Sequence, residues 1–261
     1  MASTRTRARF ERHGDVGVVV IHDPPLNLFG RELAADLLAA IAEAESEPIR
    51  CLMIRAEGEV FTAGADVNVF KGQSEAEASA FFGELVGLVH RLEEMPIPTF
   101  ASVHGLCLTA GFELSLGCDL IWASESARFG LVEIVVGLTP GMGGTQRVAE
   151  RAGPARAREL VMTGGLYDAG TLERWNVVNR VLSDAELAEK ATKFGHRLAA
   201  GPTLANAATK RIVRAQTDEG TRGADARTAD IGAPLFETED LKGVVEKFLS
   251  EGPGKASFRG G

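Results

Sequence analysis

The chain has 261 residues, of which 45% are hydrophobic, enough for one large domain with a substantial buried core. Its formal net charge of −8 excludes the basic surface on which non-specific nucleic-acid binding depends. No apolar run reaches the ~18 residues that a membrane span needs. We therefore expect a globular protein with neither a nucleic-acid partner nor a membrane span.

Cysteine and histidine usage gives no sign of a metal site. The three cysteines form no CxxC pair, and the five histidines form no HxH or HExxH pattern. We interpret Cys51, Cys107 and Cys118 as small core residues in a reducing compartment. Residues 1–10 are rich in Arg, Ser and Thr, as in a transit peptide, but strand-like alternation begins by Phe10. The expectation is a cytoplasmic protein without a metal.

In chain order, strand-like and helix-like segments alternate over the first two thirds of the sequence. Alternating or continuous apolar residues predict strands over 7–22 (a hairpin), 50–55, 99–103, 106–108, 119–123 and 177–182. Apolar residues at helical spacing predict helices over 32–45, 74–94, 112–117, 154–162 and 169–175, and a glycine-rich helix start over 140–147. This order is typical of an α/β body.

Beyond residue 184 the strand pattern stops. Helices are predicted over 184–199, 203–216, 221–236 and 239–250. We divide the chain into an α/β core over residues 1–195 and a helical region over residues 196–261. Since no low-complexity linker separates them, the helical region is expected to pack on the core or on a neighbouring subunit.

Two glutamates lie in apolar, glycine-punctuated surroundings, where burial of a carboxylate is costly. Glu113 follows a turn of small residues at 109–112, and Glu133 ends the apolar run 129–133. A second loop of small residues occupies 63–66. Free backbone N–H groups in such turns bind oxyanions, and two that converge on one carbonyl oxygen make an oxyanion hole. Carboxylates beside that hole can move protons at the carbon next to the carbonyl.

Each of these features also has a purely structural interpretation. Glycine-rich turns before helices are common packing devices. Glu113 could complement a helix dipole, and Glu133 could be a buried salt-bridge partner. Phe81 and Phe82 are assigned to the core or the surface.

Five segments, in this order, give the sequence a family resemblance. They are residues 61–67, 110–114, 117–120, 129–133 and 137–147. Together they strongly resemble the enoyl-CoA hydratase/isomerase (crotonase) superfamily over nearly the whole chain. The resemblance implies an α/β fold of stacked ββα turns forming a superhelix. It also implies a C-terminal helical region that serves trimer formation, with trimers that often pair into hexamers.

The resemblance further implies acyl-CoA thioester substrates and no separate cofactor, because CoA is part of the substrate. The backbone N–H groups of Ala65 and Ala110 would form the oxyanion hole. Glu113 would act as base toward the water that attacks Cβ, while Glu133 would supply the proton to Cα. Contacts to CoA and substrate would come from Leu26, Asn27, Ala63, Ala65, Asp66, Val67, Asn68 and Gly111, with Phe248 reaching CoA from a neighbouring subunit.

Several positions depart from the family pattern. Ala110 replaces a glycine, so a methyl group narrows the approach to its N–H. Leu131 and Val132 replace Gln-Pro and should make the surroundings of Glu133 more apolar. Leu108 and Thr109 replace smaller residues, which predicts an unusual acyl preference. The lysines that often help bind the CoA phosphates are replaced by Asn68 and Glu251, and candidates to substitute for them are Lys71, Lys247 and Lys255.

Three functions remain open at this point. The two glutamates favour hydration of 2-trans-enoyl-CoA to 3-hydroxyacyl-CoA. A Δ3,Δ2-enoyl-CoA isomerase, or another crotonase reaction, needs only one base. A third possibility, of another class, is a non-catalytic acyl-CoA-binding or assembly protein that keeps the fold.

Overall fold

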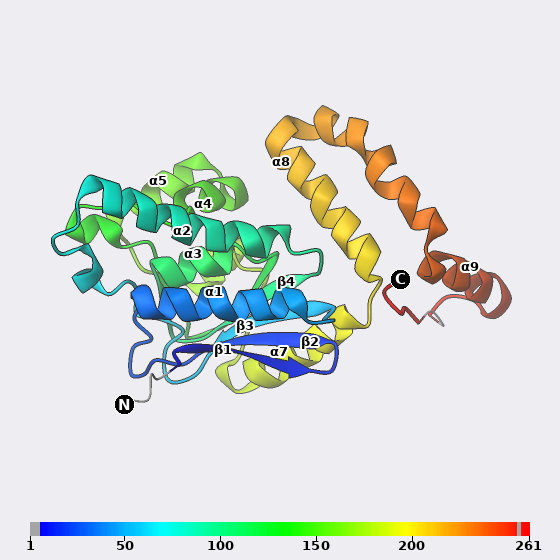
Figure 1. Ribbon diagram of the computed structural model, residues 1–261, viewed down its shortest axis with the longest axis horizontal. Coiled ribbons are helices and arrows are strands. Elements are labelled where there is room, and N and C mark those ends of the chain that lie inside the picture. Colours follow the sequence, from blue (N-terminus) through cyan, green and yellow to red (C-terminus); the bar gives the residue numbers. More distant parts are fainter. Residues whose placement is uncertain (1–5, 255–256) are drawn as a thin grey trace.

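The computed structural model describes residues 6–254 and 257–261, and its main feature is a six-stranded sheet (Figure 1). Strand β1 pairs antiparallel with β2, and the other neighbours in the order β1-β2-β3-β4-β6-β9 are parallel. The strands are β1 (Ala8–His13), β2 (Val16–Ile21), β3 (Cys51–Ala56), β4 (Thr99–Val103), β6 (Leu120–Ser124) and β9 (Arg180–Leu182).

Helices cover both faces of this sheet, which explains why β2 is apolar at nearly every position. In Figure 1, α1 (Arg31–Ser46) and α2 (Glu75–Glu94) lie on one side and α7 (Asp184–Ala199) on the other. Val19 and Ile21 pack into the larger core cluster with α1 and α2. Val16 and its alternate neighbours Val18 and Val20 pack with Phe194 of α7. Successive side chains of a strand point to opposite faces, so a continuous β-branched run fits a sheet buried on both sides.

A small second sheet positions the two segments that follow its parallel strands close to each other. Its strands are β5 (Leu106–Leu108), β7 (Arg128–Gly130) and β8 (Tyr167–Asp168), and β5 is parallel to β7 with Leu108 opposite Gly130. Helix α3 (Ala110–Leu116) follows β5, and the 3-10 helix η2 (Glu133–Val136) follows β7. The carboxyl ends of parallel strands lie at the same edge, so Glu113 and Glu133 are delivered to the same side of this sheet.

The loop of small residues before η1 (Val67–Phe70) runs alongside β5. Single bridges join Thr62 to Cys107 and Phe29 to Ala65. A Cβ on Gly111 would lie 1.7 Å from Cγ2 of Thr62, so only glycine allows this close approach. The loop is thereby fixed beside the turn that begins α3.

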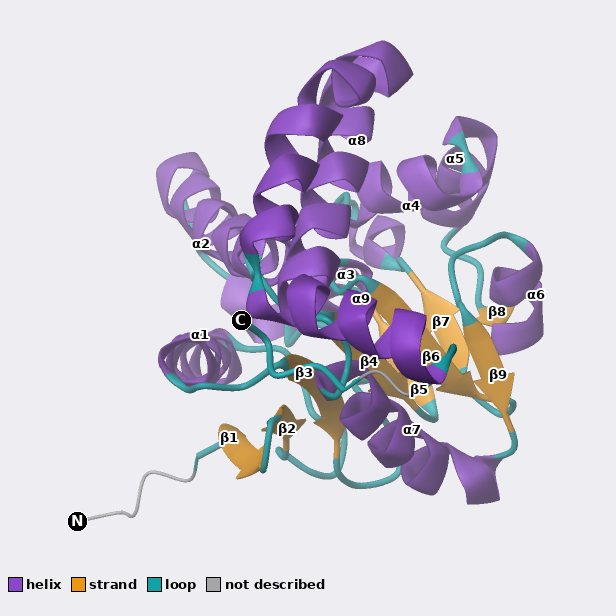
Figure 2. Ribbon diagram, turned by 90° about the vertical axis from the view of Figure 1, so that its right-hand side faces the viewer, coloured by secondary structure: helices purple, strands orange, loops and turns teal. Residues whose placement is uncertain are grey.

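The remaining helices are α4 (Gly144–Ala152), α5 (Pro154–Thr163), α6 (Ala169–Arg174), α8 (Thr203–Gly232), η3 (Ala233–Glu237) and α9 (Glu239–Glu251). Figures 1 and 2 show α8 projecting beyond the sheets before the chain returns to α9. Lys210 fastens its first half to the core through Asp119 (2.9 Å) and the carbonyl of Ile97 (3.1 Å). None of the helices in the described ranges is long and apolar enough to cross a membrane.

The expected order of an α/β core followed by helices is confirmed, with local corrections. Residues 203–216 and 221–236 were expected as two helices, and α8 indeed consists of two helices on either side of a break at Gly220 (φ 73°, ψ 175°). The second ends at Gly232, where η3 continues the chain. The strand expected over 177–182 is shorter, because only Arg180–Leu182 pair with β6. The two-residue strand β8 was not expected, since so short a segment has no periodicity to detect.

Candidate active site

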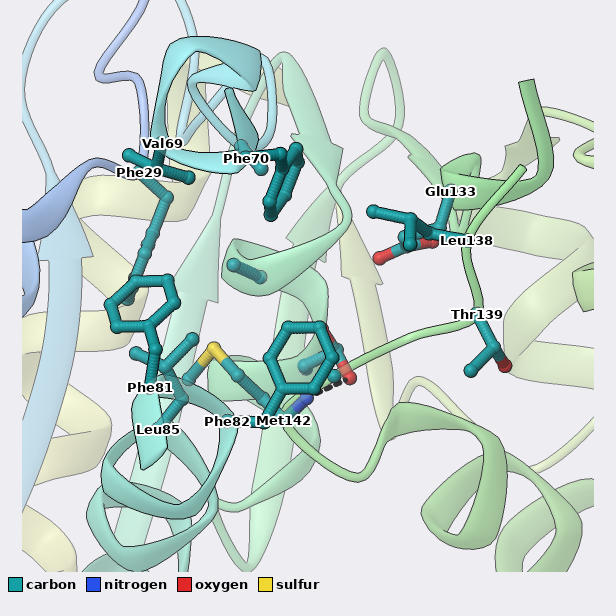
Figure 3. A pocket seen from close by; sticks show the side chains of 14 residues that line it. Phe29, Val69, Phe70, Phe81, Phe82, Leu85, Glu133, Leu138, Thr139 and Met142 are labelled. Atoms are coloured by element: carbon teal, nitrogen blue, oxygen red, sulfur yellow. Dashed lines mark hydrogen bonds between the residues drawn. The ribbon is translucent and has the colours of Figure 1, made fainter. Parts of the chain in front are cut away.

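A largely apolar pocket lies between α2, the loop before η1 and the segments that follow β5 and β7 (Figure 3). Figure 3 shows Phe81, Phe82 and Leu85 of α2 on one side and Glu133 and Leu138 on another. The lining residues are Phe29, Ala65, Val69, Phe70, Phe81, Phe82, Leu85, Ala110, Glu113, Glu133, Leu138, Thr139, Gly141 and Met142. The structure therefore brings together both predicted glutamates and both predicted oxyanion donors.

Glu113 is 2% exposed and is held by backbone donors. Its Oε1 accepts hydrogen bonds from the N–H groups of Met142 and Gly144, both at 2.8 Å. Burial raises the pKa of Glu113 to about 7, and these two bonds and the positive charge of Arg147 oppose the rise. A carboxyl group with this pKa exchanges its proton near neutral pH, as a general base or acid requires.

Arg147 fixes the loop that supplies those two N–H groups. Its guanidinium donates to both carboxylate oxygens of Glu93 (2.7 and 2.6 Å) and to the carbonyl of Gly143 (3.1 Å). Paired donors of this kind hold a planar geometry well, and Arg147 is itself buried. The pair ties the start of α4 to the end of α2 and so holds the loop against Glu113.

Glu133 occupies the first position of η2 and is 9% exposed. In the part of the chain that the structure describes, its Oε2 has no hydrogen-bond partner. Burial raises the pKa of Glu133 to about 7, and the negative charge of Glu113 adds to the rise. Because each charge disfavours the other, the two carboxyl groups titrate as a pair in which one can hold a proton while the other has lost it.

The two predicted oxyanion donors differ in their surroundings. Ala110 is the first residue of α3, so its N–H has no acceptor within the helix. The N–H of Ala65 donates to Oγ1 of Thr109 at 2.8 Å. Sequence reasoning did not foresee this bond, because it depends on the unusual backbone of Thr109, whose φ is +48°.

Of the residues predicted to contact CoA, Ala65 lines the pocket, and the binding roles of the whole set stay predictions. Leu26 is exposed, and its carbonyl accepts from the N–H of Ala63 (2.9 Å). Asp66 precedes η1 and caps it, because its side chain accepts from the N–H of Asn68 (3.0 Å), next to the exposed Val67.

Asn27 differs from the expectation that it lines the path of a ligand. It is 1% exposed, and its amide donates to the carbonyls of Glu57 (3.0 Å) and Val60 (2.9 Å). Its side-chain oxygen accepts from the N–H of Asp23 at 2.7 Å. These bonds give it a structural role, which is to fold the loop that carries Leu26.

A second, polar hollow adjoins the pocket at Val69, and exposed Arg31 and Lys71 line it together with Asn68. Lys247 and the half-exposed Phe248 lie on α9 instead, and neither lines the pocket. Lys255, another candidate for the CoA phosphates, falls outside the described residues.

Phe81 and Phe82 were assigned to the core or the surface, and this is confirmed, since Phe81 is buried in the core and Phe82 packs against it. Their part in lining the pocket was not predicted. Both line the pocket, and a Cβ on Gly141 would lie only 2.7 Å from the ring of Phe82. The helical spacing of apolar residues predicted α2 but could not tell a core face from a pocket face. Thr109, Met142 and Arg147 were also missed as site residues, because their roles come from contacts distant in sequence.

No group of three or more His, Cys, Asp or Glu side chains is placed to hold a metal ion within residues 6–254 and 257–261. The arrangement instead offers two coupled carboxyl groups, backbone donors and an apolar chamber. These can bind an apolar group that carries a carbonyl, and can add or remove protons beside that carbonyl.

Comparisons with known proteins agree with this arrangement. Residues 11–255 match the family model of enoyl-CoA hydratase/isomerase. A crotonyl-CoA hydratase of Syntrophomonas wolfei is 32% identical over 256 residues, which cover 95% of this chain and 96% of the relative. A short-chain-enoyl-CoA hydratase of Clostridium acetobutylicum is 31% identical over 245 residues, covering 92% of this chain and 94% of the relative.

The fold has equally close counterparts. A solved structure of an enoyl-CoA hydratase subunit from Geobacillus kaustophilus matches with a TM-score of 0.92 and 32% identity, over 99% of this chain and 100% of that one. The crotonase fold expected from the sequence is thereby confirmed, including the C-terminal helices. Sequence, fold and pocket thus lead to one assignment: the chain belongs to the enoyl-CoA hydratase/isomerase family.

Proposed function

We propose that this protein catalyses the hydration of 2-trans-enoyl-CoA thioesters to 3-hydroxyacyl-CoA. The observation that carries the proposal is the presence of two buried carboxyl groups, Glu113 and Glu133, in one apolar pocket, each with a pKa raised to about 7. A hydration needs a base for the attacking water and an acid for the neighbouring carbon, and a coupled pair supplies both at neutral pH.

In the proposed reaction the thioester carbonyl lies at the oxyanion donors, and the double bond lies between the two glutamates. Ionised Glu113 takes a proton from a water molecule as its oxygen bonds to Cβ. The electron pair of the double bond moves toward the thioester oxygen, where hydrogen-bond donors stabilise the negative charge. Protonated Glu133 then gives its proton to Cα. Glu113 now holds the proton taken from water, so the pair of glutamates still carries one proton when the 3-hydroxyacyl product leaves.

The two hollows suggest how the parts of the substrate are divided. The aromatic and aliphatic lining around Phe82 suits the acyl chain. The adjoining polar hollow with Arg31 and Lys71 suits the phosphates of CoA, and Lys71 replaces the lysine absent at position 68. No separate cofactor enters this scheme.

The proposal extends to assembly and location. We propose a homotrimer, or a hexamer of two trimers, supported by the exposed apolar side chains Phe236, Phe248 and Leu249 near the C-terminus. Molar mass from light scattering coupled to gel filtration tests this. A reducing, cytoplasmic location is supported by three free cysteines, all buried.

The test of the reaction is loss of enone absorbance when the protein is mixed with crotonyl-CoA. Glu113→Gln and Glu133→Gln should each lower kcat by orders of magnitude, while the exposed Glu125→Gln serves as a matched control. Wild-type rates in both pocket variants would overturn the proposal.

A 3-enoyl-CoA offered to the same protein separates the alternatives. Rapid conversion to the 2-enoyl product without water addition would replace the hydratase with an isomerase. Tight binding of CoA esters without turnover of any of them would instead favour the non-catalytic alternative.

A further inference from the structure

The turn between β5 and α3 contains a backbone conformation that its residue does not favour. Thr109 has φ +48° and ψ −125°, and a β-branched residue at positive φ is a genuine outlier. Strain of this kind is found where the surrounding structure fixes it, often at functional sites. Two bonds fix it here: the N–H of Thr109 donates to Gly130 (2.8 Å), and its carbonyl accepts from Glu113 (2.9 Å).

The strained backbone directs the threonine hydroxyl to one of the pocket's own N–H groups. Oγ1 of Thr109 accepts from the N–H of Ala65 at 2.8 Å, and the side chain is buried. A Cβ on Gly64 would lie 2.8 Å from Oγ1 of Thr109 and 3.3 Å from its Cγ2. The side chain is therefore packed along Gly64, with its hydroxyl beside a residue that lines the pocket.

This bond uses the lone pair of the hydroxyl and leaves its hydrogen available. In the part of the chain that the structure describes, the Thr109 hydroxyl donates to no neighbour. A hydroxyl that accepts one hydrogen bond becomes a stronger donor of the next, because the bonds in a chain polarise each other. Hydroxyl side chains are effective donors to oxyanions in other active sites.

From this geometry we propose that Thr109 is a catalytic residue whose hydroxyl donates to the thioester oxygen, in the place where Ala65 would otherwise donate directly. Ala65 then acts one bond further away, by polarising the hydroxyl, and the N–H of Ala110 is the second donor. The inference rests on the proposed acyl-CoA chemistry of this pocket. It assigns the oxyanion hole of this chain one side-chain donor and one backbone donor.

The test measures the stretching frequency of the thioester carbonyl directly. Butyryl-CoA labelled with ¹³C at its thioester carbon has no double bond to hydrate, so its C=O stretch can be measured on the protein by difference infrared spectroscopy. A donor to the oxygen lowers that frequency. We expect a lowered frequency on the wild-type protein and loss of at least half of the shift in Thr109→Ala and in Thr109→Val. The second variant keeps the side-chain volume, in case the first loses stability.

Thr109→Ser retains the hydroxyl and should restore the shift. Thr62→Val is the matched control, since Thr62 is also a buried threonine whose hydroxyl accepts a backbone N–H, that of Gly64 at 3.0 Å, but Gly64 does not line the pocket, whereas Ala65, the donor to Thr109, does. This variant should show the wild-type frequency. On crotonyl-CoA, Thr109→Ala should lower kcat by ~10²–10³-fold, the usual cost of one oxyanion donor, with a smaller change in KM.

A shift in Thr109→Ala equal to or larger than that of the wild type would overturn the inference, because Ala65 would then reach the carbonyl itself. The infrared measurement does not depend on turnover. A protein that shows the Thr109-dependent shift yet fails to hydrate any enoyl-CoA would refute the proposed hydratase and leave the role of Thr109 standing.

Discussion

Gly144 and Glu113 approach each other more closely than any other residue at position 144 would allow. The N–H of Gly144 donates to Oε1 of Glu113 at 2.8 Å, and a Cβ on this glycine would lie 2.7 Å from Cγ of the glutamate. The absence of a side chain thus sets where the carboxylate lies.

Gly144→Ala should therefore move Glu113 rather than simply weaken a bond. A displacement of about 1 Å at a catalytic group costs up to ~10²-fold in rate, so we expect a loss of kcat of about 10- to 100-fold on crotonyl-CoA. Gly87→Ala is the matched control, because a Cβ at that position of α2 meets no atom within 4 Å. Equal kcat in the two variants would contradict the positioning role of Gly144.

The activity should depend on pH as a bell. The pKa values of Glu113 and Glu133 are both raised to about 7, so the state with a single shared proton is most populated near neutral pH. Below this range both groups are protonated and the base is lost; above it both are ionised and the acid is lost. Measurement of kcat from pH 5 to 9 checks this.

The titration of the substrate must be distinguished from that of the protein in this experiment, because the phosphate monoester of CoA also titrates near pH 6. Crotonyl-pantetheine lacks that phosphate and should give the same bell. A kcat that stays flat across the range with this substrate would show that the two carboxyl groups do not share the proton.

Stability should fall as pH rises through the same range. The folded protein keeps a proton on Glu113 up to a pH of about 7, whereas the unfolded chain releases it near the ordinary value of 4.5. The stabilisation is complete below the unfolded value and is lost as the pH rises through the folded one. One pKa unit corresponds to about 1.4 kcal/mol, so the loss is of order 3 kcal/mol.

Glu113→Gln tests this directly, because its side-chain oxygen can still accept from Met142 and Gly144 but carries no charge. Urea unfolding at pH 5 and pH 8 should give a free energy of unfolding that declines in both proteins but by a smaller amount in the variant, where burial of Glu133 still contributes its own decline. Parallel declines in the two proteins would assign the pH dependence to other groups.

Acyl preference should respond to Phe82. Replacing this ring with Ala enlarges the apolar end of the pocket, and each additional buried methylene contributes about 0.8 kcal/mol, which is about fourfold in kcat/KM. Phe82→Ala should therefore raise the ratio of kcat/KM for octenoyl-CoA to that for crotonyl-CoA. Met162→Ala, at an exposed position outside the pocket, is the control, and a ratio unchanged in both would place the acyl chain elsewhere.

The parts of the site that could be predicted from the sequence are those carried by local patterns. Glu113 and Glu133 were found because each is a carboxylate in an apolar, glycine-punctuated segment. The parallel pairing of β5 with β7 then brought both to one edge, an arrangement that the family resemblance implied and that periodicity alone would not give.

The parts that could not be predicted depend on distant contacts or rare backbone states. Arg147 lies in a recognisable motif, but its pairing with Glu93 joins residues 54 positions apart. The bond from Ala65 to Thr109 requires a threonine at positive φ, which residue preference argues against. The aromatic residues of α2 show only that the helix has an apolar face, and the identity of what lies against that face is a tertiary property.

The division of the pocket between two sources has a consequence for how such a protein can change. Glu113, Glu133 and the turn at Thr109 follow β5 and β7, while Phe81, Phe82 and Leu85 come from a helix on the larger sheet. If the proposed function holds, substitutions of Phe81, Phe82 or Leu85 alter which acyl group is admitted and leave Glu113 and Glu133 in place. Glu93, at the far end of the same helix, still holds the loop that carries Met142 and Gly144 through Arg147, so one helix can change the shape of the chamber at one end and keep the position of Glu113 at the other.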